Sequence, residues 1–284
     1  MELLAGRKCH DALNPLHSLI YFAPEAEEEF TAVGLDQGRM CYFAGRSAAM
    51  GAVGAGPVAA AFFNFDPALV ARHVPRAWTL ASPAAVLEAR QRAVDRTLRR
   101  LLGDGIAADP EVAEAAALAL RAAEACTPAG RTLYAAHAEL PVPDEPHLAL
   151  WHAITLLREY RGDGHLAALT EAELDGPQAL VTHTATGRGF TTAFARASRG
   201  WTDTAWAQAA DRLAGRGLLD TTGALTEAGH ALRRSVEDTT DRLAHAPFAH
   251  LGQAGVERLT AVGRELTATA MSNGAFPRGV FSRT

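Results

Sequence analysis

Two segments in the first half of the chain begin with the same signal, a capping residue followed directly by proline. Ser82-Pro83 and Asp109-Pro110 each precede a long stretch that contains no glycine or proline. Serine and aspartate side chains accept hydrogen bonds from the first free N–H groups of a helix, and proline fits its first turn. The signal predicts helices over residues 83–102 and 110–126.

Alanine dominates the apolar residues, and runs of β-branched and aromatic residues are scarce. Alanine is the best helix former because it loses no side-chain entropy in a helix. Hydrophobic residues make up 48% of the chain and charged residues 21%, which is ordinary for globular proteins, so the chain can bury a core. The composition therefore predicts an all-α fold.

The last third contains the string "DRLAGRGLLDTTGALTEAGHALRRSVEDTTDRL", residues 211–243. It resembles the end of a MarR-type winged helix, in which a recognition helix ends in a Gly-Leu step, a wing follows, and "LTEAG" opens the next helix. The full expectation is an all-α chain: a multi-helix N-terminal bundle, then a degenerate winged-helix module with at most a very short β-wing. We expect a helical ligand-pocket domain over 1–165, the winged-helix-like module over 166–252, and a C-terminal helix and tail over 253–284.

The charge of this module disfavours DNA as a partner without excluding it. Between residues 201 and 251 stand five arginines and seven acidic residues, a balance of −2, and the whole chain carries −5. DNA affinity depends mainly on phosphate neutralisation by Lys and Arg. The expected recognition helix offers Gln208 and two arginines.

The densest group of functional side chains lies in "PHLALWHAITLLREYRGDGHLAAL", residues 146–169. On a helix, His147, Trp151 and Arg158 share one stripe, a mixture that suits the wall of a ligand pocket. Alternatively, Trp151 is a core residue, His147 caps the helix and Arg158 pairs with an acid.

We expect the glycines of the segment 161–164 to break this helix and His165 to begin the next. His165 would then act as general acid or base, Asp163 would orient its imidazole, and Arg158 or Arg161 would clamp an anion. The alternative is that Asp163 only caps the following helix.

Aromatic residues concentrate in the first 65 positions, which suggests an apolar cavity, although ordinary core packing would also explain them. The side chains expected to bind a small-molecule ligand there are His17, Tyr21, Tyr42, Arg46, Phe62 and Phe65. We interpret the glycines in the segment 51–56 as sites of close helix packing, since no strand precedes them as a phosphate-binding loop would require.

Several classes of protein are disfavoured by what the sequence lacks. Cys9, Cys41 and Cys126 are widely spaced, which argues against a disulfide framework or a structural zinc site, and no motif predicts a metal. No cofactor is required, although a haem held by one axial histidine stays open. We see no secretion signal and no membrane span, and expect a cytoplasmic protein. A homodimer is an open alternative.

Over nearly its whole length the chain resembles a large actinobacterial family labelled as helix-turn-helix proteins. The resemblance rests on "HSLIYFAPEAEEEF", "YFAGR", "FFNFDPALVARHVPRAW", "HLALWHAITLLREYRGDGH" and "RGWTDTAWAQAADRLAGRGLLD". The label describes the C-terminal module and implies little about activity.

Three functions remain in competition. The first is a cofactor-light enzyme that acts on a small organic molecule, such as a natural-product intermediate, by His/Asp acid–base chemistry in an aromatic-lined pocket. The second is a ligand-responsive winged-helix transcriptional regulator. The third is a protein that binds haem or another tetrapyrrole. We expect the enzyme, because the charge of the C-terminal module disfavours DNA.

Overall fold

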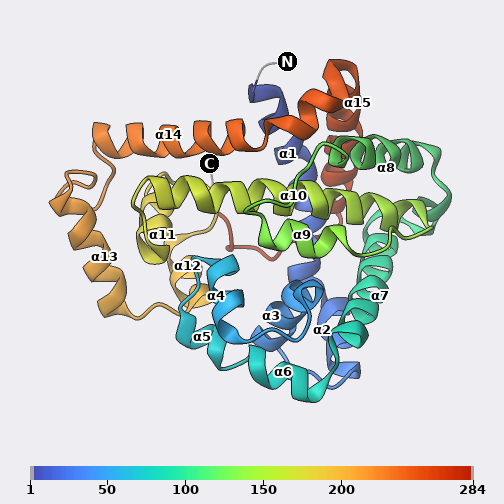
Figure 1. Ribbon diagram of the computed structural model, residues 1–284, viewed down its shortest axis with the longest axis horizontal. Coiled ribbons are helices and arrows are strands. Elements are labelled where there is room, and N and C mark those ends of the chain that lie inside the picture. The colour runs from blue at the N-terminus through green and yellow to red at the C-terminus, as the bar shows by residue number, and fades with distance from the viewer. Residues whose placement is uncertain (1–2, 283–284) are drawn as a thin grey trace. The chain divides into compact units, whose positions relative to one another are not determined.

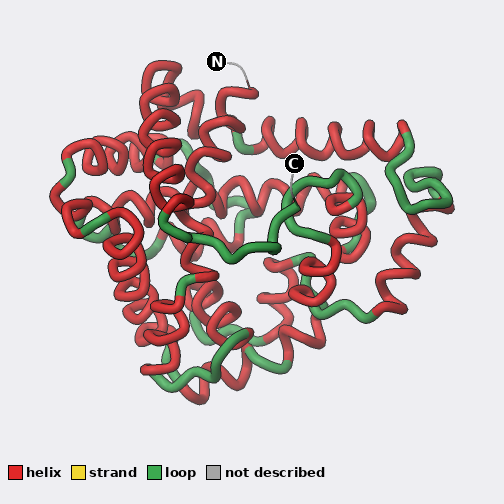
Figure 2. Tube along the Cα trace, turned by 180° about the vertical axis from the view of Figure 1, so that it is seen from behind, coloured by secondary structure: helices red, strands yellow, loops and turns green. Residues whose placement is uncertain are grey.

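The computed structural model describes residues 3–282, and these residues fold into helices joined by loops (Figure 2). Extended pairing within this range is limited to two isolated antiparallel bridges, Phe190–Phe281 and Leu219–Leu225. The prediction of an all-α fold is confirmed. No helix among these residues is both long enough and apolar enough to cross a membrane.

The chain divides into two compact units, and each unit combines segments that are distant in sequence. Unit 1 comprises Met1–Val53, His73–Gly164 and Asp241–Phe276, and unit 2 comprises Gly54–Arg72, His165–Thr240 and Pro277–Thr284. Two helices contribute residues to both: α10 (Pro146–Glu171) passes into unit 2 at His165, and α14 (Glu227–Leu243) ends in unit 1.

Unit 1 is a helical bundle (Figure 1). Besides parts of α10 and α14, its helices are α1 (Leu3–Ser18), η1 (Leu19–Phe22), α2 (Pro24–Ala32), α3 (Arg39–Ser47), η2 (Ala48–Met50), α6 (Val74–Leu80), α7 (Pro83–Leu102), η3 (Asp104–Ala108), α8 (Pro110–Ala123), α9 (Thr132–Ala138) and α15 (His245–Ser272).

The expected helix starts in this unit are confirmed. The Ser82 hydroxyl accepts from the Ala85 N–H at the start of α7, and the Asp109 carboxylate accepts from the Glu111 N–H at the start of α8. The core forms where α1 packs along α15, α15 along α8, and α2 along α7.

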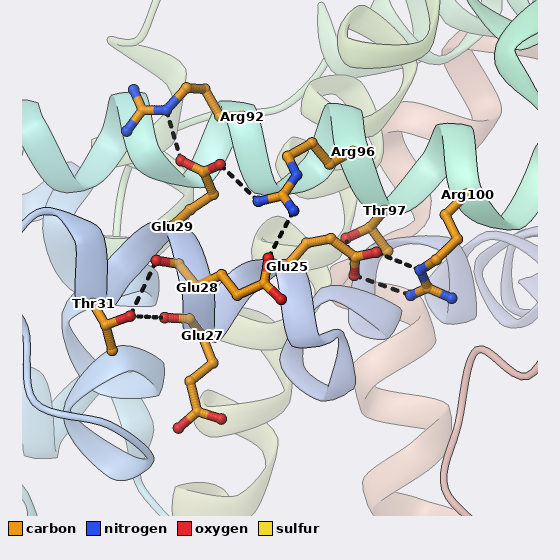
Figure 3. A network of polar contacts seen from close by, with 9 residues as sticks. All are labelled: Glu25, Glu27, Glu28, Glu29, Thr31, Arg92, Arg96, Thr97 and Arg100. Atoms are coloured by element: carbon orange, nitrogen blue, oxygen red, sulfur yellow. Dashed lines mark hydrogen bonds and ion pairs between the residues drawn. The ribbon is translucent and has the colours of Figure 1, made fainter.

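A ladder of charged side chains joins α2 to α7 (Figure 3). Glu29 accepts from Arg92 Nε at 2.7 Å and from Arg96 Nη1 at 2.9 Å. One turn earlier, Glu25 pairs with Arg100 and accepts from the Thr97 hydroxyl. The arginine side chains are 42–49% exposed and the Glu25 carboxylate is buried, so the ladder joins α2 to α7 at the border between core and solvent.

Besides parts of α10 and α14, the helices of unit 2 are α4 (Ala55–Phe62), α5 (Pro67–Ala71), α11 (Gly176–Thr184), α12 (Thr192–Arg199) and α13 (Asp203–Gly215). A short turn joins α12 to α13. Gly200 ends α12 with a left-handed φ of +79°, and the Thr202 hydroxyl caps α13 at the Ala205 N–H.

A tight hairpin follows α13. The Asp220 N–H donates to the Ala224 carbonyl at 2.9 Å, and the Thr226 N–H donates to the Leu218 carbonyl at 3.1 Å. The hairpin contains a single bridge, so its arms are barely longer than the turn itself. Gly229, in the first turn of α14, lies directly against the Leu218 carbonyl oxygen and leaves no room for a Cβ.

Two local expectations are wrong. The segment 161–164 does not break a helix, since α10 runs without interruption over 26 residues. The glycines of the segment 51–56 do not mediate close packing, because no atom lies within 4 Å of the place where a Cβ would stand on Gly51, Gly54 or Gly56. Gly51 instead adopts a φ of +79° at the end of η2, and Gly54 caps α4.

Candidate functional site

Unit 1 encloses a cavity of about 340 Å³, a volume at the lower end of the range for small-molecule sites. Helices α1, α2, α3, α7, α9 and α10 and the 3-10 turn η1 line it. Its polar and aromatic lining includes His17, Tyr21, Phe22, Phe30, Tyr42, Arg46, Arg90, His137, Trp151 and Glu159.

A buried carboxylate shared by two arginines forms one wall. Glu159 is 1% exposed, and its oxygens lie 2.9 Å from Arg46 Nη2 and 2.6 Å from Arg158 Nη1. Burial alone would raise the pKa of this carboxyl group, but the charges of Arg46 and Arg158 outweigh burial and hold the pKa well below its usual range. Glu159 is therefore ionised at every physiological pH.

A second guanidinium group of the lining, that of Arg90, has no carboxylate partner in the part of the chain that the structure describes. Its Nη1 donates to the Gly45 carbonyl at 3.2 Å and to His137 Nε2 at 3.0 Å, and the guanidinium stands 5.5 Å from the Trp151 ring. Burial lowers the pKa of Arg90 to about 10, so the group stays charged near neutral pH.

The contacts of His137 fix its protonation. Its Nδ1 lies 2.8 Å from the Leu133 carbonyl and must donate, so Nε2 accepts from Arg90. Burial and the charge of Arg90 lower the pKa of His137 to about 3. The imidazole is therefore neutral and serves as a hydrogen-bond acceptor.

Aromatic rings form another part of the cavity lining. His17 stacks on Trp151 with ring centroids 4.9 Å apart and an interplanar angle of 9°, and Tyr21 contacts both His17 and Tyr42 edge to face. Burial, together with the charge of Arg158, lowers the pKa of His17, which is therefore neutral. Burial raises the pKa of Tyr21 to about 12.

The structure brings five of the residues expected to bind a ligand into this cavity, namely His17, Tyr21, Tyr42, Arg46 and Trp151. Arg158 lies outside the lining, where it pairs with Glu159 and donates from Nε to Asn14 at 3.2 Å.

The other expected binding residues lie elsewhere. His147 Nε2 pairs with Asp95 at 2.6 Å, and Arg161 pairs with Asp241 at 2.8 Å, both within unit 1. Phe62 and Phe65 belong to unit 2, where their rings lie 6.0 Å apart.

Asp163 and His165 each make a separate structural contact. The Asp163 carboxylate accepts from the Tyr134 N–H at 2.9 Å near the start of α9, and burial raises the pKa of Asp163 to about 6. In unit 2, His165 Nδ1 lies 2.8 Å from the Thr240 hydroxyl. Since α10 is continuous, side chains two positions apart point to different faces, and the two residues do not form the expected pair.

Sequence reasoning missed Arg90, His137 and Glu159. Arg90 carried a usable signal, because it stands between Val86 and Val94 on the apolar stripe of α7, where a solvated arginine would not lie. Glu159 carried none, since a carboxylate directly after an arginine, here Arg158, usually faces solvent.

The helices α12 and α13 of unit 2 present few uncommitted cations. Arg212 pairs with Asp175 at 2.7 Å, Arg216 donates to the Glu173 and Ala172 carbonyls, and Arg196 pairs with Asp203. The outer face of α13 exposes Thr204, Gln208, Asp211 and Arg212. Within the described chain, no group of three or more His, Cys, Asp or Glu residues could hold a metal ion.

A family model described as a helix-turn-helix family matches residues 6–277. No curated protein and no solved structure matches the chain significantly. The expectation of a small-molecule enzyme is wrong on this finding, because a helix-turn-helix family points to a DNA-binding regulator, the alternative that the sequence left open. The match covers nearly every residue of both units, and the chain therefore belongs to this helix-turn-helix family.

Proposed function

We propose that the protein is a ligand-responsive DNA-binding regulator, in which unit 1 binds a small molecule and the α12–α13 pair of unit 2 contacts DNA. The family match over residues 6–277 carries the proposal, because it spans the helix pair and the helices that line the cavity alike.

The local geometry of unit 2 supports a DNA-reading role for α13. A capped helix follows a short turn after α12, and a hairpin comes directly after it, which is the order of a winged helix with a shortened wing. Gln208 is exposed near the middle of α13, and a glutamine there could pair with adenine in the major groove.

Helix α10 offers a path for the response to ligand. It carries Glu159 and Trp151 of the cavity wall, and its last residues, from His165 onward, belong to unit 2. A ligand that changes the position of α10 would thereby act on a helix that both units share.

Selection of genomic fragments on the full chain at low salt, followed by fluorescence anisotropy, tests DNA binding. We expect Gln208→Ala to weaken binding to the selected site by about 5- to 150-fold, the value of one bidentate base contact. Gln253→Ala is the matched control, since Gln253 is also an exposed glutamine on a helix and belongs to unit 1. Failure to enrich any sequence over random DNA would refute the proposal.

The scarcity of uncommitted arginines sets the expected salt dependence. We expect each chain to neutralise about two to four phosphates. A plot of the logarithm of the binding constant against the logarithm of the salt concentration should then have a slope of about −2 to −4. A two-fold symmetric selected site would indicate that the chain binds as a homodimer.

A further inference from the structure

The cavity of unit 1 contains more buried positive than negative charge. Among its lining residues, Arg46 forms an ion pair with Glu159. Glu159 also pairs with Arg158, which does not line the cavity. Glu27 lies at the exposed rim, where it accepts from the Gly38 N–H. Arg90 is 7% exposed and makes no ion pair within the described chain, so one buried guanidinium has no carboxylate in direct contact.

Three buried polar atoms of lining residues have no hydrogen-bond partner among residues 3–282. They are Arg90 Nε, Trp151 Nε1 and His17 Nδ1. The first two are obligate donors, and leaving a donor unpaired in the interior costs about 1–3 kcal/mol. Trp151 contacts both of the other residues, since its ring stacks on His17 with centroids 4.9 Å apart and lies 5.5 Å from the Arg90 guanidinium. This group of atoms is suited to an acceptor that carries negative charge.

The shape and polarity of the remaining wall restrict the rest of the ligand. Tyr21, Phe22, Phe30 and Tyr42 offer ring surfaces, and Ile20 and Ala26 add aliphatic surface. Flat conjugated molecules gain most from such walls, through stacked and edge-to-face contacts.

We propose that the cavity binds a planar aromatic carboxylic acid, with its carboxylate on Arg90 and its ring among the aromatic side chains. The inference rests on the proposed function only in naming the effector class of that regulator. Binding of the acid to unit 1 is measurable whether or not unit 2 binds DNA.

Calorimetry on the full chain with two matched probes, 2-naphthoate and 2-naphthamide, tests the charge requirement without altering the protein. The two probes share ring and size but differ in charge. We expect naphthoate to bind at least about 30-fold more tightly, since leaving a buried charge unpaired costs at least that factor. Equal affinities would overturn the proposal, and so would the absence of saturable naphthoate binding up to about 1 mM.

Arg90→Gln identifies the partner of the carboxylate. This variant is expected to bind naphthoate at least about 30-fold more weakly while its affinity for naphthamide changes by less than about 3-fold. The control is Arg121→Gln, an exposed arginine of α8, a helix that does not line the cavity. Equal loss of both probes would mean that Arg90 only maintains the cavity, which would overturn its assigned role.

The result is distinguishable from failure of the proposed function. Naphthoate binding by a chain that enriches no DNA sequence would refute the regulator and leave the acid site standing. DNA binding by a chain that does not bind naphthoate would refute the acid site and leave the DNA-binding role standing.

Discussion

Replacement of Glu159 by glutamine removes the charge that neutralises two arginines inside unit 1. The glutamine side chain has nearly the same shape, so the cavity keeps its packing, but Arg46 then remains in the wall with a side chain only 13% exposed and no counter-charge. Removal of one partner of a buried ion pair costs about 3–5 kcal/mol. We expect a loss of about 3 kcal/mol in the free energy of unfolding, because Arg158 can move its charge toward solvent.

Urea and thermal unfolding of the full chain, followed by far-UV circular dichroism, measure this loss. For a chain of this size the loss corresponds to a decrease in Tm of roughly 6–12 °C. Glu111→Gln is the control, because Glu111 is half exposed and pairs with an exposed arginine, Arg258, and should leave stability unchanged. If the two variants unfold alike, the buried pair contributes nothing beyond a surface pair, and the reasoning is refuted.

The remaining predictions concern pH and two close contacts. The folded pKa of His137, about 3, lies below its unfolded value of about 6.5, so the unfolded chain binds the extra proton first. Stability should therefore fall as the pH decreases from about 6.5 to 3, and His137→Gln should reduce that slope in urea titrations across this range. Gly45→Ala would place a Cβ 2.5 Å from the Phe30 ring, and calorimetry should show weaker naphthoate binding as the ring moves into the cavity. Gly229→Ala would collide with the immobile Leu218 carbonyl, so DNA binding should be lost and proteolysis of unit 2 accelerated while naphthoate binding persists.

Features encoded within a few residues were predictable from the sequence. The caps at Ser82, Asp109 and Thr202 depend on hydrogen bonds that close within three positions, so the residue types alone indicate the helix starts. The glycines of the segment 161–164 led to the wrong prediction of a helix break. Each glycine destabilises a helix by only about 1 kcal/mol relative to alanine, and the packing of α10 can offset this.

The candidate site was predictable only in part, because its polar centre is made by tertiary contacts. The concentration of aromatic residues led to His17, Tyr21 and Tyr42, which line the cavity. The role of Glu159 depends on Arg46, 113 positions away, and no local pattern records that meeting. The prediction of an enzyme was wrong for a related reason. It relied on the net charge of the C-terminal module, whereas assignment to a helix-turn-helix family depends on the order of the helices and turns.

Unit 1 contains partly exposed ion pairs between α2 and α7 and a buried ion pair between Arg46 and Glu159. The two kinds differ in how they affect the rate at which a ligand would leave the cavity. Helix α2, which supplies part of the cavity wall, is held to α7 by arginines that are 42–49% exposed. At physiological ionic strength the screening length is roughly 8 Å, and salt weakens ion pairs that are exposed to solvent. Salt hardly affects the buried pair between Arg46 and Glu159. Higher ionic strength should therefore loosen α2 and shorten the residence time of a bound molecule, while the buried charges that select the molecule remain unchanged.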